Sequence, residues 1–66
     1  MIIKSEYMGK RVKILTADGQ ECSGKVVEME GPETTESGEP EIGINYAGGI
    51  RMFAESELDG IELLKK

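Results

Sequence analysis

Carboxylates are the side chains of this 66-residue protein with the most evident capacity for chemistry. The acidic stretch, residues 28–41, has no Lys or Arg and carries six of them: Glu28, Glu30, Glu33, Glu36, Glu39 and Glu41. A calcium loop needs oxygen ligands at close alternating positions around a central glycine. Here the carboxylates stand two or three residues apart and are interrupted by two prolines. We therefore predict a solvated loop that holds no metal ion.

A second acidic group, Glu55 and Glu57 with Asp59 and Glu62 nearby, has the composition of an acid–base pair. No nucleophile accompanies these residues, and the absence of histidine removes the commonest general base and zinc ligand. The single cysteine, Cys22, falls on an apolar strand face and is expected to pack as a small hydrophobe. We predict no catalytic residue, no cofactor and no metal site, and hence a protein that is not an enzyme.

The length allows one domain, residues 1–66, with a core of aliphatic residues because Trp is absent and the other aromatics are few. One cysteine cannot form an internal disulfide, which favours an intracellular compartment. The apolar run at the N-terminus is too short for the hydrophobic region of a signal peptide, and no apolar run in the sequence is long enough to cross a membrane. These features predict a soluble, cytoplasmic protein with no membrane association and no evident small-molecule substrate.

Charge is unevenly distributed along the chain, which has a formal net charge of −5. Lys10, Arg11, Lys13 and Lys25 make the first part basic, and a basic strand face of this kind can meet phosphate. Nucleic-acid-binding domains are usually basic overall and carry aromatic side chains that stack on bases. The acidic total and the scarcity of aromatics favour a solvated strand face over an RNA interface, although RNA remains the alternative partner.

Short runs of alternating polarity, separated by glycine and turn residues, predict an all-β protein built as a five-stranded small barrel. The expected strands cover residues 10–16, 21–30, 41–46, 50–54 and 60–64. Asp18-Gly19 is typical of a hairpin turn, and residues 55–58 fit one 3₁₀ turn before the last strand. Residues 5–8 fit either one helical turn with Ser5 as its N-cap or an extended lead-in segment.

Alternation also predicts which side chains fill the barrel. Gly24 inside the long second strand indicates a sharp bend that lets one strand serve both sides of the barrel. Residues 50–54 and 60–64 are the expected sheet edges, with Ile50, Met52, Ile61 and Leu63 as candidate oligomer contacts. The expected core residues are Val12, Ile14, Cys22, Val26, Ile42, Ile44, Ile50, Met52, Leu58, Ile61 and Leu63.

This order of elements resembles that of the Sm-like family, within the broader class of SH3-like barrels. The resemblance rests on Tyr7-Met8-Gly9-Lys10-Arg11-Val12, on Asp18-Gly19-Gln20-Glu21 and on Gly24-Lys25-Val26. The ending, residues 53–63, is similar to short Sm-like proteins of Gram-positive bacteria whose role is mostly unassigned. The resemblance implies an Sm-like fold, and it implies RNA binding or edge-to-edge rings as activities common in that family.

The chain departs from the family pattern where Sm-like proteins hold RNA. That pocket uses an Asp and an Asn in the loop after the second strand, and an Arg-Gly or similar pair near the fifth. Residues 31–36 contain no Asn, and residues 54–57 contain no basic residue. The resemblance therefore implies the fold but no RNA-contacting residue.

The sequence favours a non-enzymatic binding or assembly module that acts through protein–protein contacts, because small barrels leave strand edges that can pair with another chain. The partner is expected to be another protein or a second copy of the chain. The alternative is an RNA-binding Sm-like protein that uses the face formed by Lys10, Arg11, Lys13 and Lys25.

Overall fold

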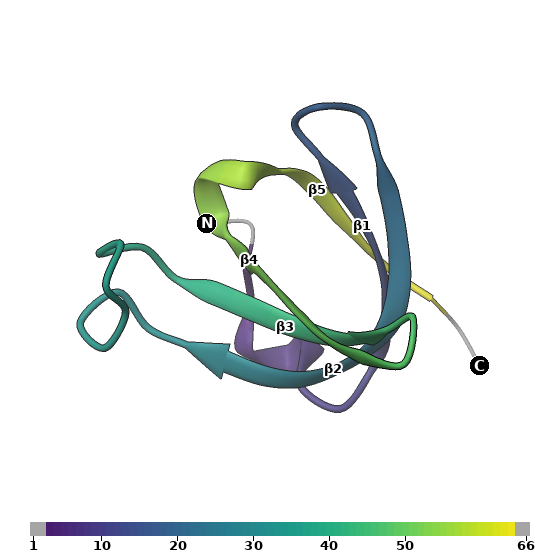
Figure 1. The fold of residues 1–66 in the computed structure, drawn as a ribbon. Helices are drawn as coiled ribbons and strands as arrows, with labels where there is room; N and C mark the ends of the chain where they lie inside the picture. The colour runs from purple at the N-terminus through teal and green to yellow at the C-terminus, as the bar shows by residue number, and fades with distance from the viewer. Residues whose placement is uncertain (1–2, 65–66) are drawn as a thin grey trace.

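A computed structural model describes residues 3–64, which form an all-β structure with two short 3₁₀ turns (Figure 1). The prediction of five strands with one 3₁₀ turn before the last strand is confirmed, and of the two alternatives for residues 5–8 the structure has the helical turn. In chain order the elements are η1 (Ser5–Tyr7), β1 (Arg11–Thr16), β2 (Glu21–Glu30), β3 (Glu41–Tyr46), β4 (Gly49–Ala54), η2 (Glu55–Glu57) and β5 (Leu58–Leu63).

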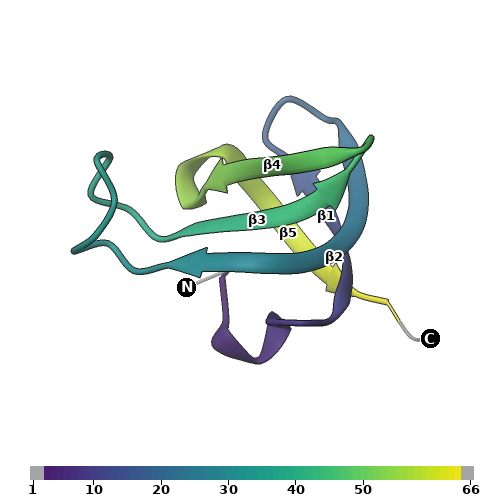
Figure 2. The same ribbon diagram turned by 60° about the horizontal axis from the view of Figure 1, so that its bottom comes forward.

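The five strands form one antiparallel sheet in the order β4-β3-β2-β1-β5 (Figure 2). The sheet curls around a single core, so that β4 and β5 are its two ends. The residue range Glu21–Lys25 of β2 pairs with β1, whereas its second half, from Val26 to Glu30, pairs with β3. The ten-residue β2 therefore belongs to both halves of the curled sheet, as the sequence predicts.

Gly24 lies where β2 passes from one half of the sheet to the other. A Cβ atom at this position would lie 2.0 Å from the backbone oxygen of Asn45 in β3. The backbone of β3 therefore approaches β2 more closely than any side chain would allow. The glycine is required by this close approach, and its place at the bend agrees with the prediction.

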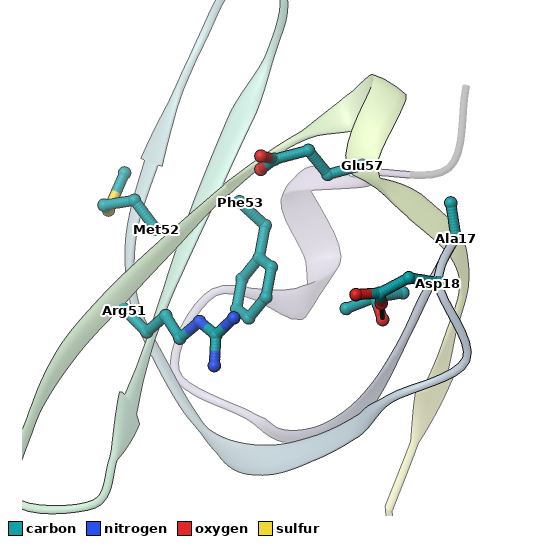
Figure 3. A pocket seen from close by; sticks show the side chains of 7 residues that line it. Ala17, Asp18, Arg51, Met52, Phe53 and Glu57 are labelled. Carbon is teal, nitrogen blue, oxygen red and sulfur yellow. Dashed lines mark hydrogen bonds between the residues drawn. The ribbon is translucent and has the colours of Figure 1, made fainter.

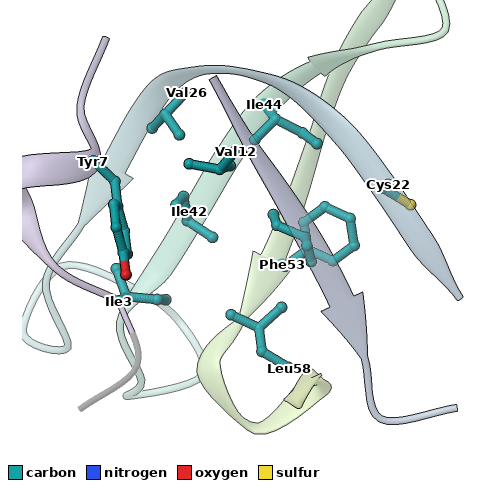
Figure 4. Close-up of a cluster of buried hydrophobic side chains, with 10 residues drawn as sticks. Ile3, Tyr7, Val12, Cys22, Val26, Ile42, Ile44, Phe53 and Leu58 are labelled. Carbon is teal, nitrogen blue, oxygen red and sulfur yellow. The ribbon is translucent and has the colours of Figure 1, made fainter. Parts of the chain in front are cut away.

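The N-terminal turn differs from the prediction in one detail. The N-cap residue of η1 is Lys4, with no side-chain cap, so Ser5 is the first residue of the turn and not its cap. The turn carries Tyr7 into the core, where the side chain is 8% exposed. Ile3 is buried beside it, and neither residue was expected to contribute to the core (Figure 4).

The centre of the core agrees with the alternation in β1, β2 and β3. Six side chains there are essentially inaccessible to solvent: Val12, Ile14, Cys22, Val26, Ile42 and Ile44. Leu58, at the start of β5, is also buried, as predicted. Facing strands thus supply branched aliphatic side chains to one cluster, and burial of such groups is the main favourable contribution to folding.

The prediction for β4 is wrong about which face turns inward. Ile50 is 58% exposed and Met52 is 37% exposed, whereas Phe53 is buried at 3%. Phe53 pairs directly with Ile42, whose side chain faces the core, so the two share the inner face. The apolar residues on both faces of β4 left the sequence pattern ambiguous, and the register with β3 resolves it.

The prediction for β5 holds in part. The strand begins at Leu58, two residues earlier than expected, and Ile61 is half-buried and packs against the core. Leu63 pairs with Val12 but remains 45% exposed, so its assignment to the core was wrong. It is the last residue of β5 at the end of the sheet, and within residues 3–64 no further strand lies beside it.

Substitution of Gly24 by alanine tests the close approach between β2 and β3. Gly24→Ala should destabilise the protein by about 1–3 kcal/mol, because the Asn45 carbonyl is backbone and cannot rotate away. Gly49→Ala is the matched control, since nothing lies within 4 Å of a Cβ atom there. Urea denaturation of both variants measures the difference, and equal stabilities would contradict the argument.

Candidate functional site

The structure brings most of the predicted basic face together. Arg11 in β1 lies directly opposite Lys25 in β2, and both side chains are exposed on the outer face of the sheet. Lys10 is exposed just before β1. Like charges directly opposite each other on a sheet are mildly destabilising, so this pair is a local concentration of positive charge without a structural benefit.

Lys13 is the least available member of the basic face. Its Nζ atom lies 3.5 Å from Glu62 Oε1 in β5, its partner across the strand pair. Tyr7 and Phe53 are buried, which leaves Tyr46 in β3 as the more exposed aromatic residue. Among the described residues, this more exposed aromatic ring contacts Arg51 of β4 and not a cation of the basic face, and one of the four cations of that face already has an acidic neighbour.

The two predicted edges are the two ends of the sheet, but their apolar side chains lie on different faces. Ile50 and Met52 of β4 pair with Asn45 and Gly43 and point to the outer face. In β5, Ile61 and Leu63 pair with inward-facing residues of β1 and lie on the inner face. The four residues therefore do not form one continuous surface.

Ile50 and Met52 form an exposed apolar surface on β4, here called the β4 patch. Both side chains pack against Gly43 of β3. A Cβ atom on this glycine would lie 2.4 Å from Met52 Sδ and 3.3 Å from Ile50 Cγ2. The two side chains therefore fold over the glycine and broaden the apolar surface beside the strand edge. Exposed apolar side chains that cluster at a sheet edge are typical of contact surfaces.

A pocket of about 280 Å³ lies between β4 and the turn that connects β1 to β2 (Figure 3). The pocket could not be predicted from the sequence, because its residues come from three separate segments of the chain. They are Thr16, Ala17, Asp18, Arg51, Met52, Phe53 and Glu57. Of the elements around the pocket, the sequence predicts the hairpin turn at Asp18-Gly19 and the 3₁₀ turn that contains Glu57.

Arg51 forms one side of the pocket and is held there by stacking. Its guanidinium carbon lies 5.0 Å from the centroid of the Phe53 ring and 5.9 Å from that of Tyr46. Its Nη1 atom also lies 3.9 Å from Cys22 Sγ. Such cation–π contacts fix the plane of the guanidinium without neutralising its charge.

Asp18 stands across the pocket from Arg51. Its carboxylate accepts a hydrogen bond from the Thr16 hydroxyl, and this bond is the main reason that the pKa of Asp18 lies below its usual value of 3.8. The backbone N–H groups of Asp18 and Gln20 and the positive charge of Arg51 lower the pKa further, while reduced hydration opposes them. Asp18 is therefore ionised at neutral pH.

Glu57 is the second carboxylate of the pocket. Its Oε1 atom accepts a hydrogen bond of 2.9 Å from the backbone N–H of Ala54, which fixes the side chain over η2. The acidic stretch reaches the same turn, because Glu39 accepts a 2.7 Å hydrogen bond from the Ser56 N–H. Two carboxylates and one guanidinium thus line the pocket beside the Phe53 ring.

Other kinds of site find little support in the described part of the chain. Between residues 3 and 64, no three Cys, Asp or Glu side chains are grouped so that they could hold a metal ion. Cys22 is buried and free. No helix within that range has the length and apolarity needed to cross a membrane.

Comparisons with protein-family models, with curated proteins and with solved structures found no match to this chain.

Replacing the Thr16 hydroxyl by a methyl group tests the electrostatics of the pocket. In Thr16→Val the pKa of Asp18 should rise toward its usual value, because the largest stabilisation of the carboxylate is lost. Carboxyl-carbon NMR during a pH titration measures the change, and Thr34→Val in the acidic stretch is the control.

The same substitution changes how stability depends on pH. A pKa lowered by folding contributes stability above the unfolded value of 3.8, and this contribution disappears as the pH falls through the folded value. In the wild-type protein, the stability that Asp18 contributes is lost as the pH falls below 3.8. In Thr16→Val this contribution is smaller, so the free energy of unfolding should fall less over the same pH range. An unchanged Asp18 titration in this variant would contradict the assignment.

Proposed function

We propose that this protein is a non-enzymatic, Sm-like binding and assembly module of the cytoplasm that acts through protein–protein contacts made by the free edge of β4. The observation that carries the proposal is an unpaired strand edge with exposed apolar side chains beside it. Within residues 3–64, β4 pairs with β3 on one side and with no strand on the other. Such an edge offers a row of backbone donors and acceptors to another chain.

β4 has only one of the features that usually protect a free edge from pairing, the charged Arg51 on its inward face. Natural sheets protect their edges with lysine, proline, bulges or inward-pointing charges. β4 contains neither lysine nor proline, and its register with β3 is unbroken from Gly49 to Ala54. β5 is better protected, because Asp59 and Glu62 are exposed and its pairing with β1 is irregular between Leu15 and Thr16.

The β4 patch adds apolar surface to this edge. Ile50 and Met52 remain exposed although the neighbouring Phe53 is buried, so a partner strand could cover them and gain hydrophobic stabilisation. The resemblance to Sm-like proteins supports the same conclusion, because barrels of that family join edge to edge. The single free cysteine supports the cytoplasmic assignment.

Sedimentation velocity from micromolar to millimolar protein tests self-association through β4. We expect weak, concentration-dependent association that is abolished in Ile50→Lys, because this change puts a desolvated charge into the contact. Ser23→Lys is the matched control, since it adds the same charge at an exposed position of the central strand β2. A monomer over the whole range would refute self-association, and equal effects of both variants would refute the β4 contact.

The alternative function is RNA binding by the basic face, and it is favoured by one observation, the exposed pair of Arg11 and Lys25. We expect little binding at moderate salt, because the chain has a net charge of −5 and phosphate contacts weaken as salt increases.

Fluorescence anisotropy with a labelled oligouridine at two salt concentrations tests this expectation. Tight, salt-dependent binding that is weakened by Lys25→Ala but not by Lys4→Ala would establish the alternative instead. Both substitutions remove one lysine, so a difference between them locates the contact on the basic face.

A further inference from the structure

We infer that the free edge of β4 takes an extended segment of another protein in which apolar and basic residues alternate. This inference rests on the proposed function and specifies the chemistry of the partner. The apolar side chains of the segment would cover the β4 patch. A basic side chain on the opposite face would enter the pocket between Asp18 and Glu57.

The alternation follows from the two faces of β4. Ile50 and Met52 point outward, whereas Arg51 and Phe53 point toward the pocket. A strand that pairs with β4 extends the sheet, so its side chains alternate between the same two faces. On one face they meet exposed apolar groups, and on the other they meet the charged pocket.

The pocket lies against the backbone of β4. It is lined by Arg51, Met52 and Phe53, three consecutive residues whose side chains alternate between the two faces of the strand. A pocket that contacts all three reaches the strand backbone. β3 pairs with one edge of β4, so the other edge is open to a partner strand beside this backbone. A segment paired with β4 therefore runs past the mouth of the pocket.

The charge of the pocket favours a cation. Asp18 and Glu57 outnumber Arg51, and the low pKa of Asp18 keeps its carboxylate ionised. Arg51 opposes this attraction in part, but it is stacked on Phe53 and forms no ion pair within 4.0 Å among the described residues. The net charge of −5 also raises the encounter rate with a basic segment.

The β5 strand of a second copy is a poorer occupant of this edge. The outer face of this strand carries Glu62, which would lie beside the apolar β4 patch. The inner face carries Ile61 and Leu63, which would cover the two carboxylates without neutralising either. The pattern of β5 is therefore the reverse of what the β4 edge requires, and pairing of β4 with β5 of a second copy should be weaker than binding of a basic segment.

Titration with two short, end-blocked peptides tests the inference. In one peptide valine alternates with lysine, and in the other glutamate replaces every lysine. We expect the lysine peptide to bind and the glutamate peptide not to bind, as measured by fluorescence anisotropy. In NMR spectra the amide shifts should be confined to β4, residues 16–18 and η2. Shifts centred on the basic face, or equal affinity for both peptides, would overturn the inference.

Neutral variants locate the charge contribution. Asp18→Asn with Glu57→Gln keeps the hydrogen-bond acceptors for Thr16 and Ala54 but removes both charges, and should weaken lysine-peptide binding at least about tenfold. Glu33→Gln with Glu36→Gln removes the same charge from the acidic stretch and should have little effect. Equal weakening by both double variants would show that the peptide is attracted by net charge alone. That result would contradict the proposal that its basic side chain binds in the pocket.

The peptide and sedimentation experiments separate this inference from the proposed function. If neither peptide binds but Ile50→Lys abolishes self-association, the basic-segment inference fails and the β4 contact stands. If neither peptide binds and the protein is a strict monomer, both fail.

Discussion

The close approach of β2 and β3 at Gly24 is the constraint on which the rest of the structure depends. β2 is the one strand that pairs with β1 in one half of the sheet and with β3 in the other. The Asn45 carbonyl lies where a side chain on residue 24 would begin, so only glycine allows the two strands to pack at this bend. Without the bend, β4 and β5 could not be brought around opposite sides of the same core.

The register of β4 follows from this arrangement and creates the candidate contact surface. Once β3 directs Ile42 inward, its partner Phe53 must also point inward, and Ile50 and Met52 are left on the outside. Burial of one large aromatic ring thus exposes two aliphatic side chains at the free edge. The same register places Arg51 over Phe53 and next to the pocket. The core and the candidate binding surface are therefore two results of one strand pairing.

Charge is divided among three regions of the barrel that differ in how far their charges are already paired. On the outer face of β1 and β2, Arg11 and Lys25 lie side by side, while Lys13 has Glu62 as a neighbour. In the acidic stretch, Glu39 is hydrogen-bonded to the backbone of η2. The pocket beside β4 differs from both, because carboxylates and a stacked guanidinium face a shared space next to an unpaired strand. That combination is the reason that we propose the β4 edge as the contact region.

Local sequence was sufficient to predict the strands, the Asp18-Gly19 turn, the 3₁₀ turn at η2, the bend at Gly24 and the aliphatic core of β1, β2 and β3. These features depend on alternation and on turn residues, which act over a few positions. The inward face of β4, the burial of Tyr7 and the pocket formed by Thr16, Asp18, Arg51 and Glu57 could not be predicted. Apolar residues on both faces of β4 gave two equivalent patterns, and the pocket joins residues about forty positions apart in the chain. Only strand pairing in the folded protein chooses between such patterns and brings such residues together.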